Sequence, residues 1–253
     1  DAHHDNLLAD HKLEKKHLDL ALERNATIIE YGDTFCAMQG KWDKRADLSQ
    51  VRPEHQDGRY LDSLVETAAE FYAPYARLWA VMGPGNHELS ILKKHESCLI
   101  SRLVERMNTM TGSRIYVGGY HGWVRFYFKR SKQRMSRTLY YHHGAGGGGP
   151  VTRGVIQTNR RSVYLDGIDV VASGHTHDSW IVPISTVRLN KSCAIERRDM
   201  LHVRSPGYKD EFTTSAKGFH VERDAPPKPL GAVWLRFGFD YSLQQITLEA
   251  QLA

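Results

Sequence analysis

The chain of 253 residues contains no run of 18 consecutive apolar residues, so the sequence has no candidate transmembrane helix. Its first residues, DAHHDNLLADHK, have neither the apolar core nor the cleavage site of a signal peptide. Its three cysteines, Cys36, Cys98 and Cys193, lie far apart and form no CxxC pair. These absences argue for free thiols in a reducing compartment, the cytoplasm, and against a zinc site made of thiolates.

The chain is richer in histidine and, more modestly, in positive charge. The formal net charge is +5, which attracts polyanions such as nucleic acid, although a solvated basic surface explains it equally well. The 14 histidines include HH and HxH pairs spread along the chain, and imidazole is the commonest metal ligand. A hydrophobic content of 41% suffices for a sizeable core, so we expect a single domain over residues 1–253, although length alone also allows two.

Hydrophobic periodicity predicts helices alternating with strands in the first two thirds of the chain, and strands without long helices in the last third. Helices are expected over residues 7–24, 61–75, 88–108 and 154–164. Strands are expected over residues 26–31, 78–82, 124–128, 138–141, 168–172, 181–189, 200–203, 232–237 and 245–252. This pattern predicts an α/β fold in which helices cover one sheet, and a second sheet, built mostly from residues 178–253, packs on it.

Polar side chains follow four of the predicted strands at the points where the strands end. They are Asp33, Asn86, His87, His142, His143, His175 and His177, and the chain itself opens with Asp1 and His3. In an open α/β sheet the carboxyl ends of neighbouring strands face a common crevice, so we expect these groups to converge. Carboxylate, imidazole and amide oxygen are ligands that suit divalent Mn, Fe or Zn.

Each of these pieces alone has an ordinary structural explanation. Gly-Asp is a common turn dipeptide, Asn86 could be a helix N-cap, and the GHTH sequence could be a polar loop. All of them in this order, at strand ends and with compatible ligand types, make a joint structural explanation improbable. The sequence therefore predicts a divalent metal site.

The order of the motifs resembles that of the calcineurin-like metallophosphoesterase superfamily: DxH, GD, GNH(D/E), a His after a strand, and GHxH. Here the motifs read Asp1-Ala2-His3, Gly32-Asp33, Gly85-Asn86-His87-Glu88, His142-His143 and Gly174-His175-Thr176-His177. The resemblance extends from residue 1 to about residue 177. It implies a metallo-dependent phosphatase-like fold, a four-layer αββα sandwich of two mixed β-sheets flanked by helices, with a two-metal site on one edge.

The resemblance also implies a role for each motif residue. One divalent ion would be held by Asp1, His3, Asp33 and His177, and the second by Asp33, Asn86, His175 and one histidine of the His142-His143 pair. His142 directly follows the predicted strand and is preferred, while His143 also fits the motif. His87 would act as a catalytic imidazolium near the leaving group, oriented by Glu88 or another carboxylate.

The activity that the resemblance implies is phosphoester hydrolysis by a hydroxide that bridges two metal ions. We expect manganese, with iron, zinc or nickel as alternatives. The basic balance and the KRSKQR turn favour a phosphodiesterase or nuclease acting on nucleic acid or nucleotides, and Trp42, Tyr120, Trp123 and Trp180 could stack bases or pack in the core. The alternatives are a small-molecule or protein phosphomonoesterase, and a non-catalytic binding module on the same fold.

Two further features bear on this interpretation. The glycine run 144–149 satisfies GxGxxG with Asp169 beyond it, but such a run matches almost any glycine pattern, and Asp169 starts its strand. We instead expect a flexible loop beside the metals, in which Arg153 binds substrate phosphate. The family places an apolar strand directly before DxH, whereas this sequence starts at Asp1, so we expect residues upstream of Asp1 in the complete protein.

Overall fold

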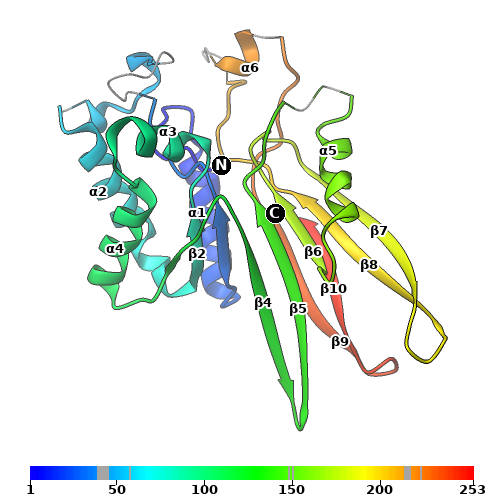
Figure 1. The fold of residues 1–253 in the computed structure, drawn as a ribbon. Helices are drawn as coiled ribbons and strands as arrows, with labels where there is room; N and C mark the ends of the chain where they lie inside the picture. Colours follow the sequence, from blue (N-terminus) through cyan, green and yellow to red (C-terminus); the bar gives the residue numbers. More distant parts are fainter. Residues whose placement is uncertain (39–45, 57, 148, 150, 214–217, 223) are drawn as a thin grey trace.

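The fold is taken from a computed structural model that describes residues 1–253 except 39–45, 57, 148, 150, 214–217 and 223 (Figure 1). Helices gather on one side of the molecule, and long strands extend from the other side. Trp42, one of the residues proposed above to stack bases, lies outside the described residues. No helix of the described residues is both long enough and apolar enough to span a membrane.

The first sheet has three parallel strands in the order β1-β2-β3 and lies beside the helices. Its strands are β1 (Ile28–Tyr31), β2 (Trp79–Gly83) and β3 (Tyr116–Val117). The helices on this side are α1 (His11–Glu23), α2 (Tyr60–Tyr72), α3 (Asn86–His95) and α4 (Leu99–Thr111), with short 3₁₀ turns η1 (Leu48–Gln50), η2 (Pro53–His55) and η3 (Ala73–Leu78). Their apolar stripes, including Leu64, Tyr72 and Leu103, pack with Met82 of β2 into one buried core.

The second sheet has five strands in the order β4-β5-β6-β8-β7. Its strands are β4 (His121–Arg130), β5 (Gln133–His142), β6 (Val170–Ser173), β7 (Trp180–Leu189) and β8 (Ile195–Arg204). β4–β5 and β7–β8 are antiparallel hairpins, and β6 lies between them, parallel to both β5 and β8. The short helices α5 (Val155–Asn159) and η4 (Arg160–Val163) lie on one face of this sheet (Figure 1).

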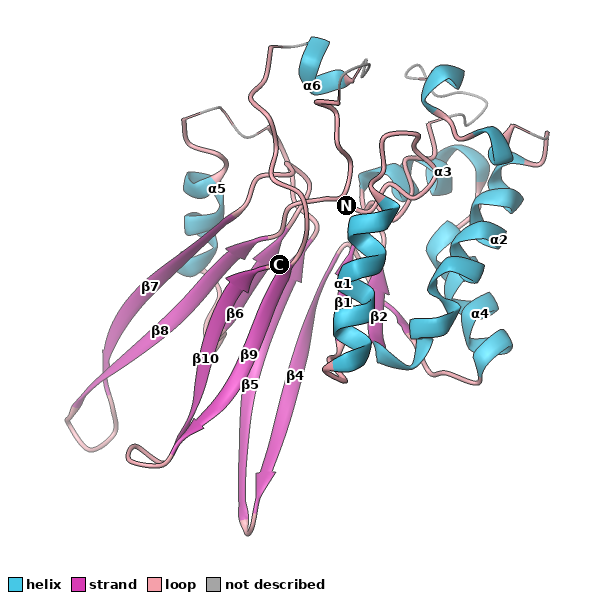
Figure 2. Ribbon diagram, turned by 180° about the vertical axis from the view of Figure 1, so that it is seen from behind, coloured by secondary structure: helices cyan, strands magenta, loops and turns pink. Residues whose placement is uncertain are grey.

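A third, two-stranded sheet pairs β9 (Val233–Asp240) with β10 (Gln245–Leu252) and lies on the opposite face of the five-stranded sheet (Figure 2). Its apolar residues Leu235 and Leu248 pack against a buried cluster that includes Val81 of β2 and Val203 of β8. This shared core joins the two larger sheets. The remaining helix, α6 (Phe219–Glu222), is short and lies close to the amino terminus of the chain in the figures.

The predicted order of helices and strands agrees with the structure in most places, with two corrections. The predicted helix 88–108 is two helices, α3 and α4, because Glu96 adopts a left-handed conformation (φ 53°) that ends α3. The second sheet does not begin near residue 178. β7 and β8 join β4, β5 and β6 in one sheet, so the division between the two larger sheets falls between β3 and β4. The apolar segment of β8 pairs with β6 and is buried there, which explains its place.

An apolar cavity of about 450 Å³ lies between β1 and β9. Ile29 and Tyr31 of β1 line one wall, and Val233 and Leu235 of β9 line another. Within the described residues β1 pairs only with β2, so the other edge of β1 faces this cavity. At the end of that edge the amino group of Asp1 donates a hydrogen bond to the carbonyl oxygen of Gly32 at 2.8 Å.

Candidate metal centre

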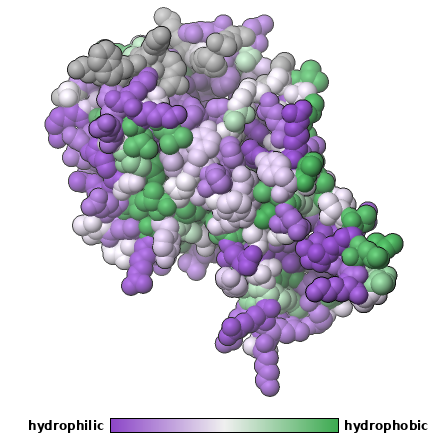
Figure 3. All heavy atoms as spheres, in the orientation of Figure 1, coloured by the Kyte–Doolittle hydropathy of each residue, from purple (hydrophilic) through white to green (hydrophobic). Residues whose placement is uncertain are grey.

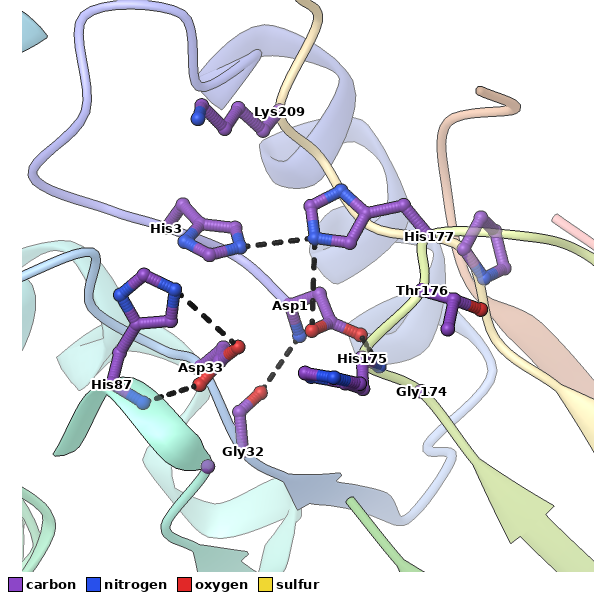
Figure 4. Close-up of polar contacts among 12 residues, drawn as sticks. Asp1, His3, Gly32, Asp33, His87, Gly174, His175, Thr176, His177 and Lys209 are labelled. Carbon is purple, nitrogen blue, oxygen red and sulfur yellow. Dashed lines mark hydrogen bonds and ion pairs between the residues drawn. The ribbon is translucent and has the colours of Figure 1, made fainter. Parts of the chain in front are cut away.

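The motif residues predicted from the sequence converge at the carboxyl ends of β1, β2, β5 and β6, beside the amino terminus (Figures 1 and 4). They form two groups. The first cluster contains Asp1, His3 and His177, and the second contains Asp33, His143 and His175. In each cluster the possible ligand atoms all lie within 4.8 Å of one another. The geometry therefore offers two adjoining places where a metal ion could bind.

In the first cluster two imidazole rings face each other with no carboxylate between them. His3 Nε2 and His177 Nε2 are 3.1 Å apart, and His177 Nε2 is 3.9 Å from Asp1 Oδ1 (Figure 4). Asp1 Oδ2 accepts a hydrogen bond from the backbone N–H of His175 at 2.8 Å, which fixes the carboxylate, while Asp1 Oδ1 is buried and has no hydrogen-bond partner among the described residues. An unpaired carboxylate oxygen beside two ring nitrogens is an arrangement that a divalent cation would satisfy.

In the second cluster the amide oxygen of Asn86 lies between two imidazoles. Asn86 Oδ1 is 3.0 Å from His143 Nε2 and 2.8 Å from His175 Nδ1, and His143 Nε2 is 3.2 Å from Asp33 Oδ2. Asp33 also connects the two clusters, because its carbonyl oxygen accepts the backbone N–H of His3 at 3.0 Å. Four side chains from four separate loops thus point at one another, as the sequence predicted.

His143, and not the preferred His142, is the histidine of the doublet that reaches the centre. His143 is fully buried, whereas the His142 ring contacts His121 and Tyr120, and its Nδ1 accepts the backbone N–H of Gly144 at 3.0 Å. The reason is strand alternation. His142 is the last residue of β5 and pairs with His121, and the next residue points to the opposite face, towards Asp33.

The hydrogen bonds behind the rings fix the faces that they present. His143 Nδ1 donates to the carbonyl oxygen of Tyr31 at 3.0 Å, so in the neutral ring Nε2 carries a lone pair. That lone pair faces the oxygens of Asn86 and Asp33, which are also acceptors. Several acceptors pointing at one place require a proton or a metal ion between them, and a histidine oriented from behind by a backbone carbonyl is typical of metal ligands.

Backbone strain is concentrated at the same place. His3, Asp33, His175 and His177 all have positive φ angles, between 52° and 74°, although none is glycine. Such conformations are costly for residues with a β-carbon and cluster at functional sites. Gly85 is also required here, because a β-carbon at this position would lie 2.1 Å from Asp33 Oδ1. Strained backbone conformations thus accompany the close approach of these side chains.

His87 lies at the rim of the two clusters. Its Nδ1 donates to the carbonyl oxygen of Cys36 at 2.5 Å, and its Nε2 lies 3.9 Å from Asp33 Oδ2 (Figure 4). Of the carboxylates expected to orient His87, Asp33 is the one that lies beside its ring, and Glu88 has other partners. The Glu88 carboxyl accepts the backbone N–H groups of Asp33, Phe35 and Gly85, so it holds the loops of the second cluster in place. Burial, reinforced by the charge of Asp33, raises the pKa of Glu88 to about 7.

Two residues that the sequence did not point to complete the surroundings. Cys36 Sγ lies 3.2 Å from His3 Nδ1, on the side of the ring away from His177. Lys209 is buried near His3 and His177, and its ammonium group pairs with Glu211 at 2.5 Å (Figure 4). No motif reveals either residue, because the sequence marks Cys36 only as an isolated thiol and Lys209 lies far along the chain.

Arg153, the predicted phosphate ligand, is exposed on the turn before α5. Its φ is 45°, and its carbonyl oxygen accepts the indole N–H of Trp180 at 3.0 Å. Within the described residues no hydrogen bond or ion pair joins its guanidinium to either cluster. Its proposed contact with substrate phosphate therefore stays a prediction.

Comparisons of the chain with protein-family models, with curated proteins and with solved structures found no match.

Proposed function

We propose that this protein is a dinuclear-metal-dependent phosphoester hydrolase of the calcineurin-like type, acting as a phosphodiesterase on nucleic acid or nucleotides. The observation that carries the proposal is the second cluster, in which His143 Nε2 lies 3.0 Å from Asn86 Oδ1 and 3.2 Å from Asp33 Oδ2. The donor set consists of imidazole, carboxylate and amide oxygen, which suits manganese, iron or zinc.

The sheet arrangement supports the four-layer sandwich that belongs to this proposal. Helices lie beside the three-stranded sheet, the five-stranded sheet packs against it through the core around Val81, and α5 lies on the far face. The cavity lined by Ile29 and Val233 lies along the edge of β1 that pairs with no strand of the described residues, and it is compatible with the further strand of the proposed sandwich.

The residues of the centre have distinct proposed tasks. Asp1, His3 and His177 would hold one ion, and Asp33, Asn86, His143 and His175 would hold the other, while Asp33 would also contribute to the first as the resemblance implies. The two ions would neutralise phosphate charge and lower the pKa of a coordinated water. His87, oriented by the Cys36 carbonyl, would use Nε2 to donate a proton to the leaving oxygen.

The test combines metal content with hydrolysis. The purified chain is loaded with Mn²⁺, and elemental analysis is compared for the wild type, Asp33→Asn and a matched control, Asp166→Asn. Asp166 is an exposed residue outside the centre, so its substitution should leave metal content unchanged. Asp33→Asn should lose metal, because its carboxylate belongs to the second cluster, where Oδ2 lies 3.2 Å from His143 Nε2.

The same three proteins are assayed on bis(p-nitrophenyl) phosphate and on p-nitrophenyl phosphate. We expect hydrolysis of the diester that chelators abolish and that Asp33→Asn removes. Faster hydrolysis of the monoester would replace the phosphodiesterase with a phosphomonoesterase. Metal binding without hydrolysis of either ester would indicate a non-catalytic binding module, and absence of metal binding would refute the proposal altogether.

A further inference from the structure

Residues 106–165 contain no aspartate or glutamate, although the whole chain has 29 of them. The same segment carries eleven lysines and arginines, more than the formal net charge of +5 for the chain, so the rest of the chain is net negative. This segment includes β4, β5, the glycine run and α5. Charge is therefore distributed very unevenly, and a positive region of this kind raises the local concentration of polyanions.

The β4–β5 hairpin has one apolar face and one face turned to solvent. On the apolar face Phe126 and Phe128 pack against Phe237 of β9, with ring centroids 4.9 Å and 5.2 Å apart. Because side chains alternate along a strand, the residues between them point to the other face. The packing on β9 holds the hairpin in place without using its outer face.

The outer face of β4 carries aromatic and cationic side chains in alternation. Trp123 and Tyr127 are 57% and 76% exposed, and Arg125 and Lys129 are exposed beside them. From β5, Arg134 is exposed opposite Lys129, with which it pairs in register. We call these five residues the hairpin stripe. Figure 3 shows the tip of this hairpin, at the bottom of the view, as strongly hydrophilic.

The hairpin stripe begins two residues along β4 from the strand end that adjoins the metal centre. β4 starts at His121, which pairs with His142, and the residue after His142 is the proposed ligand His143. Tyr120, directly before β4, contacts the His143 ring with centroids 5.2 Å apart. A strand rises about 3.4 Å per residue, so Trp123, Arg125, Tyr127 and Lys129 follow one another at roughly 7 Å intervals leading away from the centre.

We propose that the hairpin stripe binds single-stranded nucleic acid and guides it to the metal centre. Exposed aromatic rings provide stacking surfaces for unpaired bases, and the cations between them contact the phosphates. A duplex keeps its bases stacked inside and would use the cations alone. An anionic membrane would also use the cations, but it would not require an unpaired base. The identity of the destination rests on the proposed function, whereas the binding surface itself does not.

Binding is measured by fluorescence anisotropy with a labelled oligothymidine of about 16 nucleotides. The experiment is done on an Asp33→Asn background and in chelator, so that neither hydrolysis nor bound metal enters the result. The charge variant is Arg125→Gln, Lys129→Gln and Arg134→Gln combined. Its matched control is Lys12→Gln, Lys16→Gln and Arg77→Gln, which removes the same charge from exposed positions on α1 and η3.

The charge variant should weaken binding and lower the slope of log Kobs against log salt by about 2, because single strands release about 0.7 counterion per phosphate neutralised. The control should change the slope little. Trp123→Ala and Tyr127→Ala should each weaken binding by about fivefold or more. Tyr116→Ala is the control for the aromatic residues, since Tyr116 is 72% exposed on β3, outside the stripe.

Equal effects of the charge variant and its control would overturn the assignment of the surface. Equal binding of single-stranded and duplex DNA, unaffected by Trp123→Ala and Tyr127→Ala, would overturn the stacking role. Stripe-dependent binding to phosphatidylserine vesicles with no binding of the oligonucleotide would make this a membrane surface instead. If oligonucleotide binding depends on the stripe while the metal-loaded wild type hydrolyses no phosphoester, the proposed function fails, and the assignment of the binding surface stands without its destination.

Discussion

Two buried carboxyl groups of this molecule, Asp33 in the second cluster and Glu14 in the wall of the apolar cavity, have contrasting surroundings. They are 1% and 4% exposed, so both have lost nearly all contact with water. Burial raises the pKa of Glu14 to about 8, and its Oε1 accepts a hydrogen bond from the Tyr72 hydroxyl at 2.7 Å. Burial would also raise the pKa of Asp33, but the charges of His143, His87 and His3 outweigh it and hold this pKa well below the usual range.

The difference shows that burial alone does not mark a functional site. The ring nitrogens of His4 and His11 lie within 4.8 Å of the Glu14 carboxyl, but burial lowers the pKa of both histidines, so neither supplies a positive charge and the carboxyl becomes neutral. A buried carboxyl group that stays ionised needs positive charge beside it, from imidazolium groups or from a metal ion. Substitutions in the metal centre and in the wall of the apolar cavity separate these two situations.

The strongest test of the metal centre is to substitute each histidine of the His142-His143 doublet in turn. His143→Ala should remove the second metal ion and lower kcat/KM by roughly 10³-fold or more, since metal ions supply several kcal/mol of charge stabilisation. His142→Ala is the matched control and should keep both ions, because His142 packs against Tyr120 and His121 outside the clusters. Elemental analysis and diester kinetics measure both effects. The reverse pattern would restore His142 as the ligand.

The next largest effect is expected at His87, which touches the clusters without belonging to either set of proposed ligands. His87→Ala should keep the metal content and lower kcat by about 10²- to 10⁴-fold on a diester with a poor leaving group. The loss should be smaller with p-nitrophenolate as leaving group, because this group needs little protonation. A loss of metal in His87→Ala would instead make His87 a ligand, and unchanged kcat on both substrates would remove it from the mechanism.

Much of this arrangement could be predicted from the sequence, because the motif residues follow strands whose carboxyl ends meet. The periodic pattern located β1, β2, β5 and β6 closely enough to predict that Asp33, Asn86 and His175 would converge. The sequence favours His142, whereas His143 lies in the second cluster, because a shift of one residue at a strand end reverses the face on which a side chain lies.

Other features depended on contacts between distant parts of the chain. The pairing of β8 with β6, which places β7 and β8 in the five-stranded sheet, involves residues about 30 positions apart, with no local signal. The role of Glu88 could not be predicted either, because its carboxyl group accepts hydrogen bonds from the backbone N–H groups of Asp33 and Phe35, which lie in another loop. Sequence patterns predict which side chains point into a site, but not which groups hold its loops.

The apolar region is tested by Glu14→Gln, which removes the titrating group but keeps a hydrogen-bonding side chain of the same shape. The folded-state pKa of Glu14, about 8, lies above its usual value of 4.5, so its contribution to stability is fully present below pH 4.5 and is lost as the pH rises through 8. Glu14→Gln should therefore be nearly neutral at pH 5 and stabilising at pH 8.5, by about 1.4 kcal/mol per pKa unit at most.

Urea unfolding at the two pH values measures this effect. Glu23→Gln, at the exposed end of α1, is the matched control and should shift stability equally at both. A difference between Glu14→Gln and wild type that does not change with pH would mean that the Glu14 carboxyl is charged in the cavity. The contrast between the two regions would then disappear.

The smallest effect is expected at Cys36, which lies behind a proposed ligand of the first cluster. Its Sγ is 3.2 Å from His3 Nδ1 and also accepts a hydrogen bond from Asn6 Nδ2 at 3.3 Å. Burial raises the pKa of Cys36 to about 12, so the thiol stays protonated and acts as a weak acceptor for the His3 ring. Groups that orient a metal-bound histidine from behind typically change metal affinity by about 10- to 100-fold when removed.

Cys36→Ala should therefore weaken Mn²⁺ binding at the first cluster by about tenfold, at the lower end of that range because sulfur is a weak acceptor. Cys36→Ser, which keeps a polar group of similar size, should recover most of the loss. Cys98→Ala is the control, since the Cys98 Sγ accepts a hydrogen bond from the Ser101 hydroxyl in α4, away from the clusters. Titration calorimetry with Mn²⁺ distinguishes the outcomes: equal affinity in all three variants would show that His3 needs no partner behind it. A much larger loss in both Cys36 variants would make the sulfur itself a ligand, as the proximity of His3, Cys36 and His87 also allows.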